Sequence, residues 1–315
     1  MPRRSLSLLI PALLALAAAP VSGQNLEELL VQVGQEYAEA YTTPLIHGFG
    51  ANQNSGLYHT ANIPRSRLTW SVGIKFMGTY LDEGDQTFRR VLEDVELNDY
   101  LGLEPGDPGY GERGDIVLQG PTVFGDKDTN GTATAYINGA PVYSQETIPG
   151  LVDTRWVPLF APEATVGGIM GLRATVRWLP EIDFSNFGKT KYLGYGLQWS
   201  PSFLFNNLPV DVMVGFFMQD IDLGTMVQTE AESYYIAASK GFGPTTVYGG
   251  LSAESSNMKV DYVEEETQTP VKFDIDGKMK SRLTLGATFN LGVKLNAEMG
   301  IGKMVVYTAG IMFGM

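Results

Sequence analysis

The sequence predicts an all-β protein, an antiparallel transmembrane β-barrel of about 10–12 strands with an N-terminal helix as a plug. The main observation is the alternation of side chains over residues 279–315, where apolar residues such as Leu283, Leu285 and Phe289 alternate with polar residues or glycine. A period of two places alternate side chains on opposite faces of a strand. Strands of roughly ten residues with this pattern and short turns are typical of barrels in the bacterial outer membrane.

The second observation is an export signal at the N-terminus. Residues 1–23 have the pattern of a secretory signal peptide, because two arginines precede an apolar run that ends in small residues. A membrane-anchoring helix is the alternative, but it needs about 20 apolar residues, and Pro11 and Pro20 interrupt this run. We therefore predict a mature chain that begins at Gln24 and is directed to the outer membrane.

The composition supports a barrel and limits the partners. Glycine is 37 of 315 residues and charged residues make up 18%, against about 7% and 25% in ordinary soluble domains. The net charge of −13 disfavours nucleic acid as a partner. The expected partners are outer-membrane lipid and the barrel assembly machinery. No cofactor is expected, and a chain without cysteine has no thiolate chemistry.

Residues 24–63 are predicted to form the plug, a short amphipathic helix followed by an irregular collar. Asn25 can cap the helix, and apolar residues then recur at helical spacing, namely Leu26, Leu29, Leu30, Val33 and Tyr37. Pro44 is expected to end the helix, and residues 47–56 are rich in glycine and asparagine. The alternative is a helix that caps the periplasmic rim or lies loose in the periplasm.

Residues 64–315 are predicted to form the barrel. Its first strand is clear, because Leu68, Trp70 and Val72 alternate with polar residues or glycine, and these apolar residues are expected to face lipid. The pattern then fails over about 82–157, apart from a weak strand candidate near 132–137. Long loops of outer-membrane barrels are external, so we predict an external insertion that contributes at most one hairpin to the wall.

The strand phase also predicts the residues that line the lumen. These are Lys75, Arg173, Arg177, Gln198, Asp211, Gln219, Glu254, Arg282, Asn290, Lys294, Asn296 and Glu298. Both charge signs occur, so the lining is either a weakly selective aqueous path or a network of charge pairs that fills the barrel. The acidic side of the plug helix is expected to meet the arginines. Ten glycines share this inward phase, including Gly215 and Gly286; they either make room for the plug or relieve the bending of curved strands.

Enzymatic activity is not expected. Enzymes of this architecture mostly need a histidine beside a nucleophile or an aspartate. The two histidines, His47 and His59, both precede the first strand. They are interpreted as hydrogen-bonding residues of the collar.

A calcium site is a candidate in the insertion. Asp126, Asp128 and Asn130 have the spacing of the first half of a calcium loop, with Gly131 for the sharp turn. The twelfth position is Ile137, where such a loop needs a bidentate glutamate. A turn over residues 128–131, stabilised by the Asp128 side chain, explains the same residues.

Several segments resemble a family of uncharacterised outer-membrane barrels from Gram-negative bacteria: residues 48–61, 191–217, 247–256 and 308–315. The resemblance covers most of the mature chain and implies a barrel fold in the outer membrane. A more distant similarity is to long-chain fatty-acid transporters, which also place an N-terminal segment in the lumen, although their Asn-Pro-Ala hatch motif is missing here. The expected function is a plugged passive transporter or channel for small hydrophobic molecules. The alternative is a structural or surface-binding barrel with a closed lumen.

Overall fold

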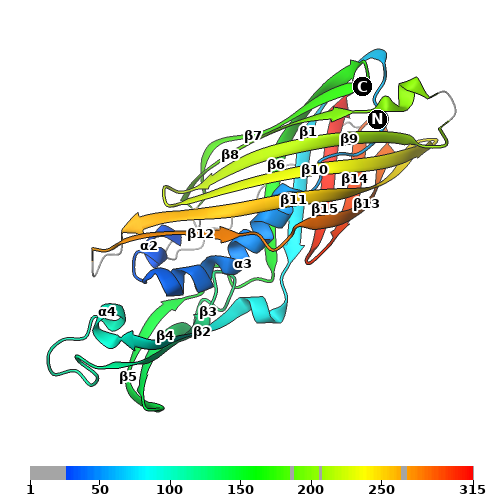
Figure 1. Ribbon diagram of the computed structural model, residues 1–315. Helices are drawn as coiled ribbons and strands as arrows, with labels where there is room; N and C mark the ends of the chain where they lie inside the picture. The colour runs from blue at the N-terminus through cyan, green and yellow to red at the C-terminus, as the bar shows by residue number, and fades with distance from the viewer. Residues whose placement is uncertain (1–25, 185–187, 206–207, 264–267, 315) are drawn as a thin grey trace, which may run out of the picture.

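The computed structural model describes residues 26–184, 188–205, 208–263 and 268–314, so the predicted signal peptide and Asn25 lie outside the described residues. In this part of the chain, ten antiparallel strands close into the predicted barrel (Figure 1). In their order around the barrel the strands are β1 (Ser66–Tyr80), β6 (Trp156–Ile169), β7 (Leu172–Phe184), β8 (Gly188–Trp199), β9 (Asp211–Leu223), β10 (Val227–Phe242), β11 (Thr245–Val263), β13 (Ser281–Asn290), β14 (Lys294–Ile301) and β15 (Val305–Gly314). The pair of β1 with β15 closes the ring, and Val72 lies opposite Phe313.

The two ends of the barrel differ. The C-terminus, the β6–β7, β10–β11 and β13–β14 turns and the β8–β9 connection with the 3₁₀ turn η2 (Pro201–Leu204) lie at one end, called here the short-turn end. The long insertion leaves the opposite end, called here the insertion end. Strand β12 (Pro270–Asp276) pairs with β11 beyond the end of β13 and extends the wall there.

The apolar phase faces outward as predicted. Leu68 is 58% exposed, Leu285 49% and Tyr307 48%. Inward neighbours such as Lys75 and Arg282 are buried. The outer surface is therefore an apolar belt suited to lipid, while polar side chains lie inside.

The insertion has more regular structure than the sequence predicts. It contributes no hairpin to the wall and instead folds into a separate antiparallel sheet of β2 (Thr87–Glu96), β3 (Arg113–Pro121), β4 (Asn130–Ile137) and β5 (Ala140–Pro149). A 3₁₀ turn, η1 (Glu83–Gln86), and a short helix, α4 (Leu97–Leu101), accompany it. Alternation is unclear in β2 because the polar Arg90 turns toward the covered face, where it pairs with Glu39.

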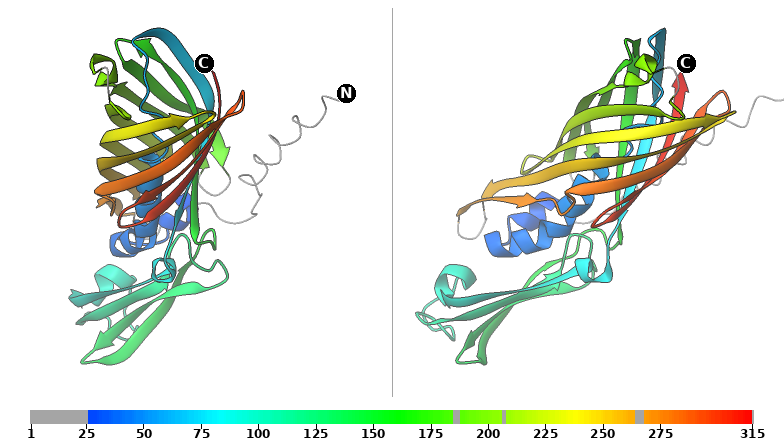
Figure 2. Two further views of the ribbon diagram at one scale, coloured as in Figure 1. Left: turned by 90° about the vertical axis from the view of Figure 1, so that its right-hand side faces the viewer. Right: turned by 45° about the vertical axis from the view of Figure 1, so that its right-hand side comes forward.

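The N-terminal helix also differs from its prediction. It is two helices, α2 (Leu26–Leu30) and α3 (Gln35–Gln53), with residues 31–34 between them. Helix α3 continues through Pro44 into the predicted collar, because both sides of this stretch are buried. Its first half lies between the barrel extension and the β2–β5 sheet, and its second half enters the barrel (Figures 1 and 2). No helix in the described part of the chain is long and apolar enough to cross a membrane.

Strands β6 and β7 separate toward the insertion end. Their last paired residues are Glu163 and Arg177. Beyond that pair, Pro158 and Pro162 lie on β6 and Pro180 lies on β7, and proline has no N–H for a ladder hydrogen bond. The prolines therefore explain why this seam stays open along the backbone.

Candidate functional site in the barrel lumen

The lumen is occupied by the C-terminal part of α3 and by residues 54–62. Wall side chains donate hydrogen bonds to nine backbone carbonyls of this plug segment, those of Gly48, Ala51, Gln53, Ser55, Gly56, Leu57, His59, Thr60 and Asn62. The barrel wall thus supplies donors to buried carbonyls of the last turns of α3 and of the non-helical residues that follow it.

Arg177 is the central donor. Its guanidinium lies 3.2 Å from the Gln53 carbonyl, 2.9 Å from that of Ser55 and 2.7 Å from that of Gly56. The Ala51 carbonyl accepts from Arg282 at 2.6 Å. The last carbonyls of a helix have no partners within it and carry its negative end. Two wall arginines therefore cap the end of α3.

This finding corrects the predicted partners of the arginines. Their carboxylate partners come from the wall: Arg177 pairs with Glu163 at 3.0 Å, and Arg282 pairs with Glu254 at 3.0 Å. All four side chains are at least 97% buried. The acidic side chains of the helices point elsewhere, since Glu27 accepts from Thr225 and Glu39 from Arg90. The wall itself thus contains the predicted charge-pair network.

Inward glycines serve this network. Four times among the described residues, a glycine sits between two polar residues on its two neighbouring strands, and those two residues bond across it. The bridges are Lys75–Gly310–Asn296, Arg177–Gly194–Gln219, Gln198–Gly215–Tyr235 and Tyr248–Gly286–Glu298. A side chain on the middle strand would block each contact. The glycines therefore make room mainly for wall side chains, which neither predicted explanation includes.

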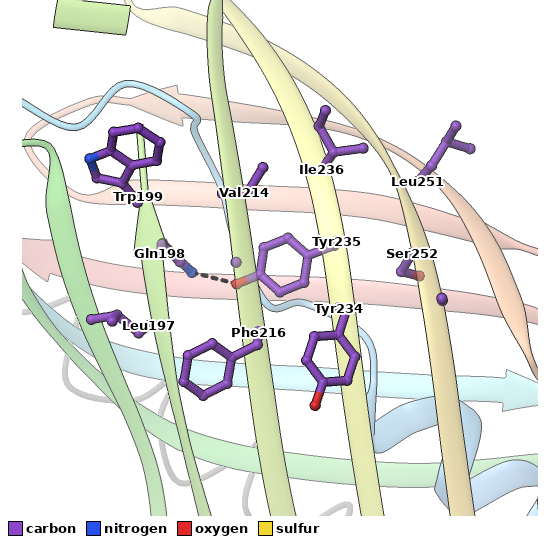
Figure 3. A pocket seen from close by; sticks show the side chains of 12 residues that line it. Leu197, Gln198, Trp199, Val214, Phe216, Tyr234, Tyr235, Ile236, Leu251 and Ser252 are labelled. Atoms are coloured by element: carbon purple, nitrogen blue, oxygen red, sulfur yellow. Dashed lines mark hydrogen bonds between the residues drawn. The ribbon is translucent and has the colours of Figure 1, made fainter. Parts of the chain in front are cut away.

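The Gln198–Tyr235 bridge lies behind a groove of about 620 Å³ on the outer wall (Figure 3). Leu197, Phe216 and Ile236 help to line this groove. Gln198 donates to the Tyr235 hydroxyl over 3.0 Å and also to the Leu57 carbonyl over 2.9 Å. The same side chain therefore ties the wall to the plug.

Most predicted lumen residues meet in this network. Arg173 donates to the carbonyls of Thr60 and Asn62, and Glu298 accepts from the Gly56 N–H at 2.7 Å. Three predicted residues lie instead at the short-turn rim. Asp211 accepts from Asn62 there, Asn290 is exposed, and Lys294 is half-buried.

The predicted plug residues are buried outside the lumen. Leu26, Leu29, Leu30, Val33 and Tyr37 belong to the apolar core at the insertion end. The Tyr37 hydroxyl accepts from Thr147 at 2.8 Å, and Tyr262 donates to the Val33 carbonyl at 2.7 Å. Helix α2 and the start of α3 therefore pack at the insertion end of the barrel and are not loose.

The candidate calcium residues lie at a turn that Asp126 stabilises, two residues before the expected turn at 128–131. Asp126 accepts from the backbone N–H of Asp128 at 2.8 Å and from the Thr129 hydroxyl at 2.7 Å, and these bonds lower the pKa of its carboxyl group. Asn130 donates to Glu146. Within the described residues, no cluster of three or more histidines, cysteines or carboxylates could hold a metal ion.

Several network residues were missed from sequence. Glu163, Tyr235 and Tyr248 complete it. The alternation along each strand was the available signal for the tyrosines. Tyr234 and Val247 face outward, so the next residues, Tyr235 and Tyr248, must face inward. Aromatic residues on barrel strands commonly face lipid, so Tyr235 and Tyr248 were not assigned to the lumen.

Solved outer-membrane proteins are similar to this chain at low identity. A loop-deletion mutant of OmpT from Vibrio cholerae is 11% identical, with 79% of this chain and 99% of that chain covered and a TM-score of 0.25. The translocator domain of the autotransporter NalP from Neisseria meningitidis is 10% identical, with 90% and 98% covered and a TM-score of 0.28. OmpF from Salmonella typhi is 10% identical, with 79% of this chain and 98% of that chain covered and a TM-score of 0.22. These scores are too low to carry a functional argument.

The sequence itself identifies the family. No curated protein matches the chain. Residues 3–315 match a family of unknown function, DUF6588. Because the match extends over nearly the whole chain, this outer-membrane-type barrel belongs to the DUF6588 family.

Proposed function

We propose that this protein is an outer-membrane barrel with a closed lumen, which anchors the β2–β5 sheet at the cell surface. The observation that supports it is the bonding of residues 48–62 to the wall. Removing this segment would leave Arg177 and Arg282 in the lumen without their carbonyl partners, and unpaired buried polar groups are costly. The stabilisation of the barrel by its plug favours a structural or surface-binding function over an open channel.

A disulfide lock tests this proposal. The hydroxyl oxygens of Ser55 and Thr308 lie 3.3 Å apart, one on the plug and one on β15, and the chain has no cysteine of its own. Ser55→Cys with Thr308→Cys should therefore form a disulfide that ties the plug to the wall. In planar bilayers we expect no steady conductance from this variant, whether oxidised or reduced. Conductance that appears on reduction and disappears on oxidation would show that the plug leaves, and would overturn the proposal.

A second candidate function is passive transport of small hydrophobic molecules, and the β6–β7 seam favours it. From Glu163 and Arg177 toward the insertion end, β6 and β7 are not paired with each other. The side chains behind the seam, including Val157, Ala161 and Leu179, belong to the apolar core. A hydrophobic molecule that parted these side chains would meet no charged group of the network before Glu163.

Closing the seam tests this second candidate. Pro162→Val with Pro180→Val restores two N–H donors to the facing edges. If the seam is a path, this variant should slow the uptake of a hydrophobic fluorophore into cells. The matched control is Pro270→Val, at the first residue of β12. Equal uptake by the unmodified protein and both variants would reject the transport function.

A further inference from the structure

A cavity of about 210 Å³ opens at the short-turn end of the barrel. It lies between the end of the plug segment and the first residues of β1, β7 and β14. Its polar lining includes His59, Asn62, Ser71, Thr165, Arg173 and Lys294. The cavity is large enough for a small ion or a single polar group and is smaller than most pockets for drug-sized ligands.

The lining carries positive charge without a compensating carboxylate. Neither Arg173 nor Lys294 forms an ion pair within the described part of the chain, and no aspartate or glutamate lines the cavity. Arg173 donates only to neutral acceptors, the carbonyls of Thr60 and Asn62 and the Gln198 side chain. The charged groups that act on His59 are also cationic: Arg173, Lys75 and Lys294.

The carboxylates nearby are already engaged. Glu163 bonds to Arg177 deeper in the lumen, and Asp211 accepts from Asn62 at the rim. Glu298 accepts from the Gly56 N–H and the Tyr248 hydroxyl. None of these three carboxylates bonds to Arg173 or Lys294, so both cations can take an anion as a direct partner.

Hydrogen-bond donors are available in the same cavity. The hydroxyls of Ser71 and Thr165 bond to each other at 2.7 Å. Only one of the two hydrogens is used in such a pair, so the other can be donated. The ammonium group of Lys294 has no hydrogen-bond partner among the described residues. A cation beside a hydroxyl donor is a typical environment for an oxyanion.

We propose that this cavity binds a small oxyanion, a phosphate or carboxylate group, with Lys294 and Arg173 as the cationic partners. The group could belong to a free anion or to the headgroup of a membrane lipid. The inference is independent of the proposed function, because the cavity lies at the rim and does not need the plug to move.

Titration calorimetry with inorganic phosphate tests the proposal on the folded, detergent-solubilised protein at constant ionic strength. Lys294→Gln removes one charge-assisted contact and should weaken binding about tenfold. Lys303→Gln is the matched control, because it makes the same charge change in the β14–β15 turn at the insertion end. We expect the control to bind phosphate like the unmodified protein. Equal phosphate binding by all three proteins would exclude free phosphate as the anion of this site.

A second titration distinguishes the two sources of the group. Micelles that contain phosphatidylglycerol replace the free phosphate, and the same three proteins are compared. Binding of free phosphate that depends on Lys294 supports a soluble anion. Lys294-dependent binding of the lipid alone supports a headgroup. The absence of Lys294-dependent binding in both titrations overturns the proposal.

Discussion

At the residue scale, the inner wall depends on glycines that leave space for a hydrogen bond to pass over them. An added Cβ at Gly215 would lie 2.6 Å from the Tyr235 ring. We therefore expect Gly215→Ala to displace Tyr235, to break its bond with Gln198, and to lower the free energy of unfolding by about 1–3 kcal/mol. Urea titration in detergent measures this loss. Gly241→Ala is the control, because no atom lies within 4 Å of its added Cβ; similar losses at both sites would contradict the bridging role.

The buried arginines should matter far more than exposed ones. Arg177→Met leaves Glu163 buried and unpaired and removes the donor of three plug carbonyls, so we expect a loss of about 3–5 kcal/mol. Arg113→Met breaks an exposed pair with Asp94 and should change the stability very little, because solvent screens exposed pairs. Urea midpoints of the two variants give the comparison. A loss below 1 kcal/mol for Arg177→Met would mean that the plug is not held by the wall.

At the element scale, a strand presents its apolar face to lipid at a defined depth. Leu285 lies in the middle of β13, and Leu291 lies in the turn that follows it. We expect Leu285→Arg to destabilise the barrel by about 2–4 kcal/mol and Leu291→Arg by about 0–1 kcal/mol, because the cost of a charge falls toward the membrane interface. Unfolding in lipid vesicles measures both values. Equal losses would show that β13 does not cross the bilayer in this register.

At the scale of the whole molecule, all of the described features at the insertion end should lie outside the cell. Trypsin added to intact cells should cut after Lys127, an exposed residue of the β3–β4 turn. Lys240, near the β10–β11 turn at the opposite end, should be cut only after the outer membrane has been disrupted. Cleavage in the reverse order would invert the topology, and the β2–β5 sheet would then be periplasmic.

The sequence by itself determined the strands, the lipid-facing phase and most of the inward-facing residues. A period of two is a local property, so residues such as Leu285 and Arg282 could be assigned to opposite faces without knowledge of their neighbours. For the same reason, the weak strand candidate near 132–137 corresponds to β4. The family resemblance agrees with the match of residues 3–315 to DUF6588.

Only the tertiary structure decided what the inward residues contact. The register between strands places Gly215 between Gln198 and Tyr235, and register depends on pairing between distant segments. The position of α3 decides that Arg177 caps a helix end, whereas helical periodicity predicts only which face is apolar. Long-range contacts likewise explain why α3 continues through Pro44 and why it packs on the β2–β5 sheet. The fold class could therefore be predicted from local pattern, but the contacts between the plug and the wall could not.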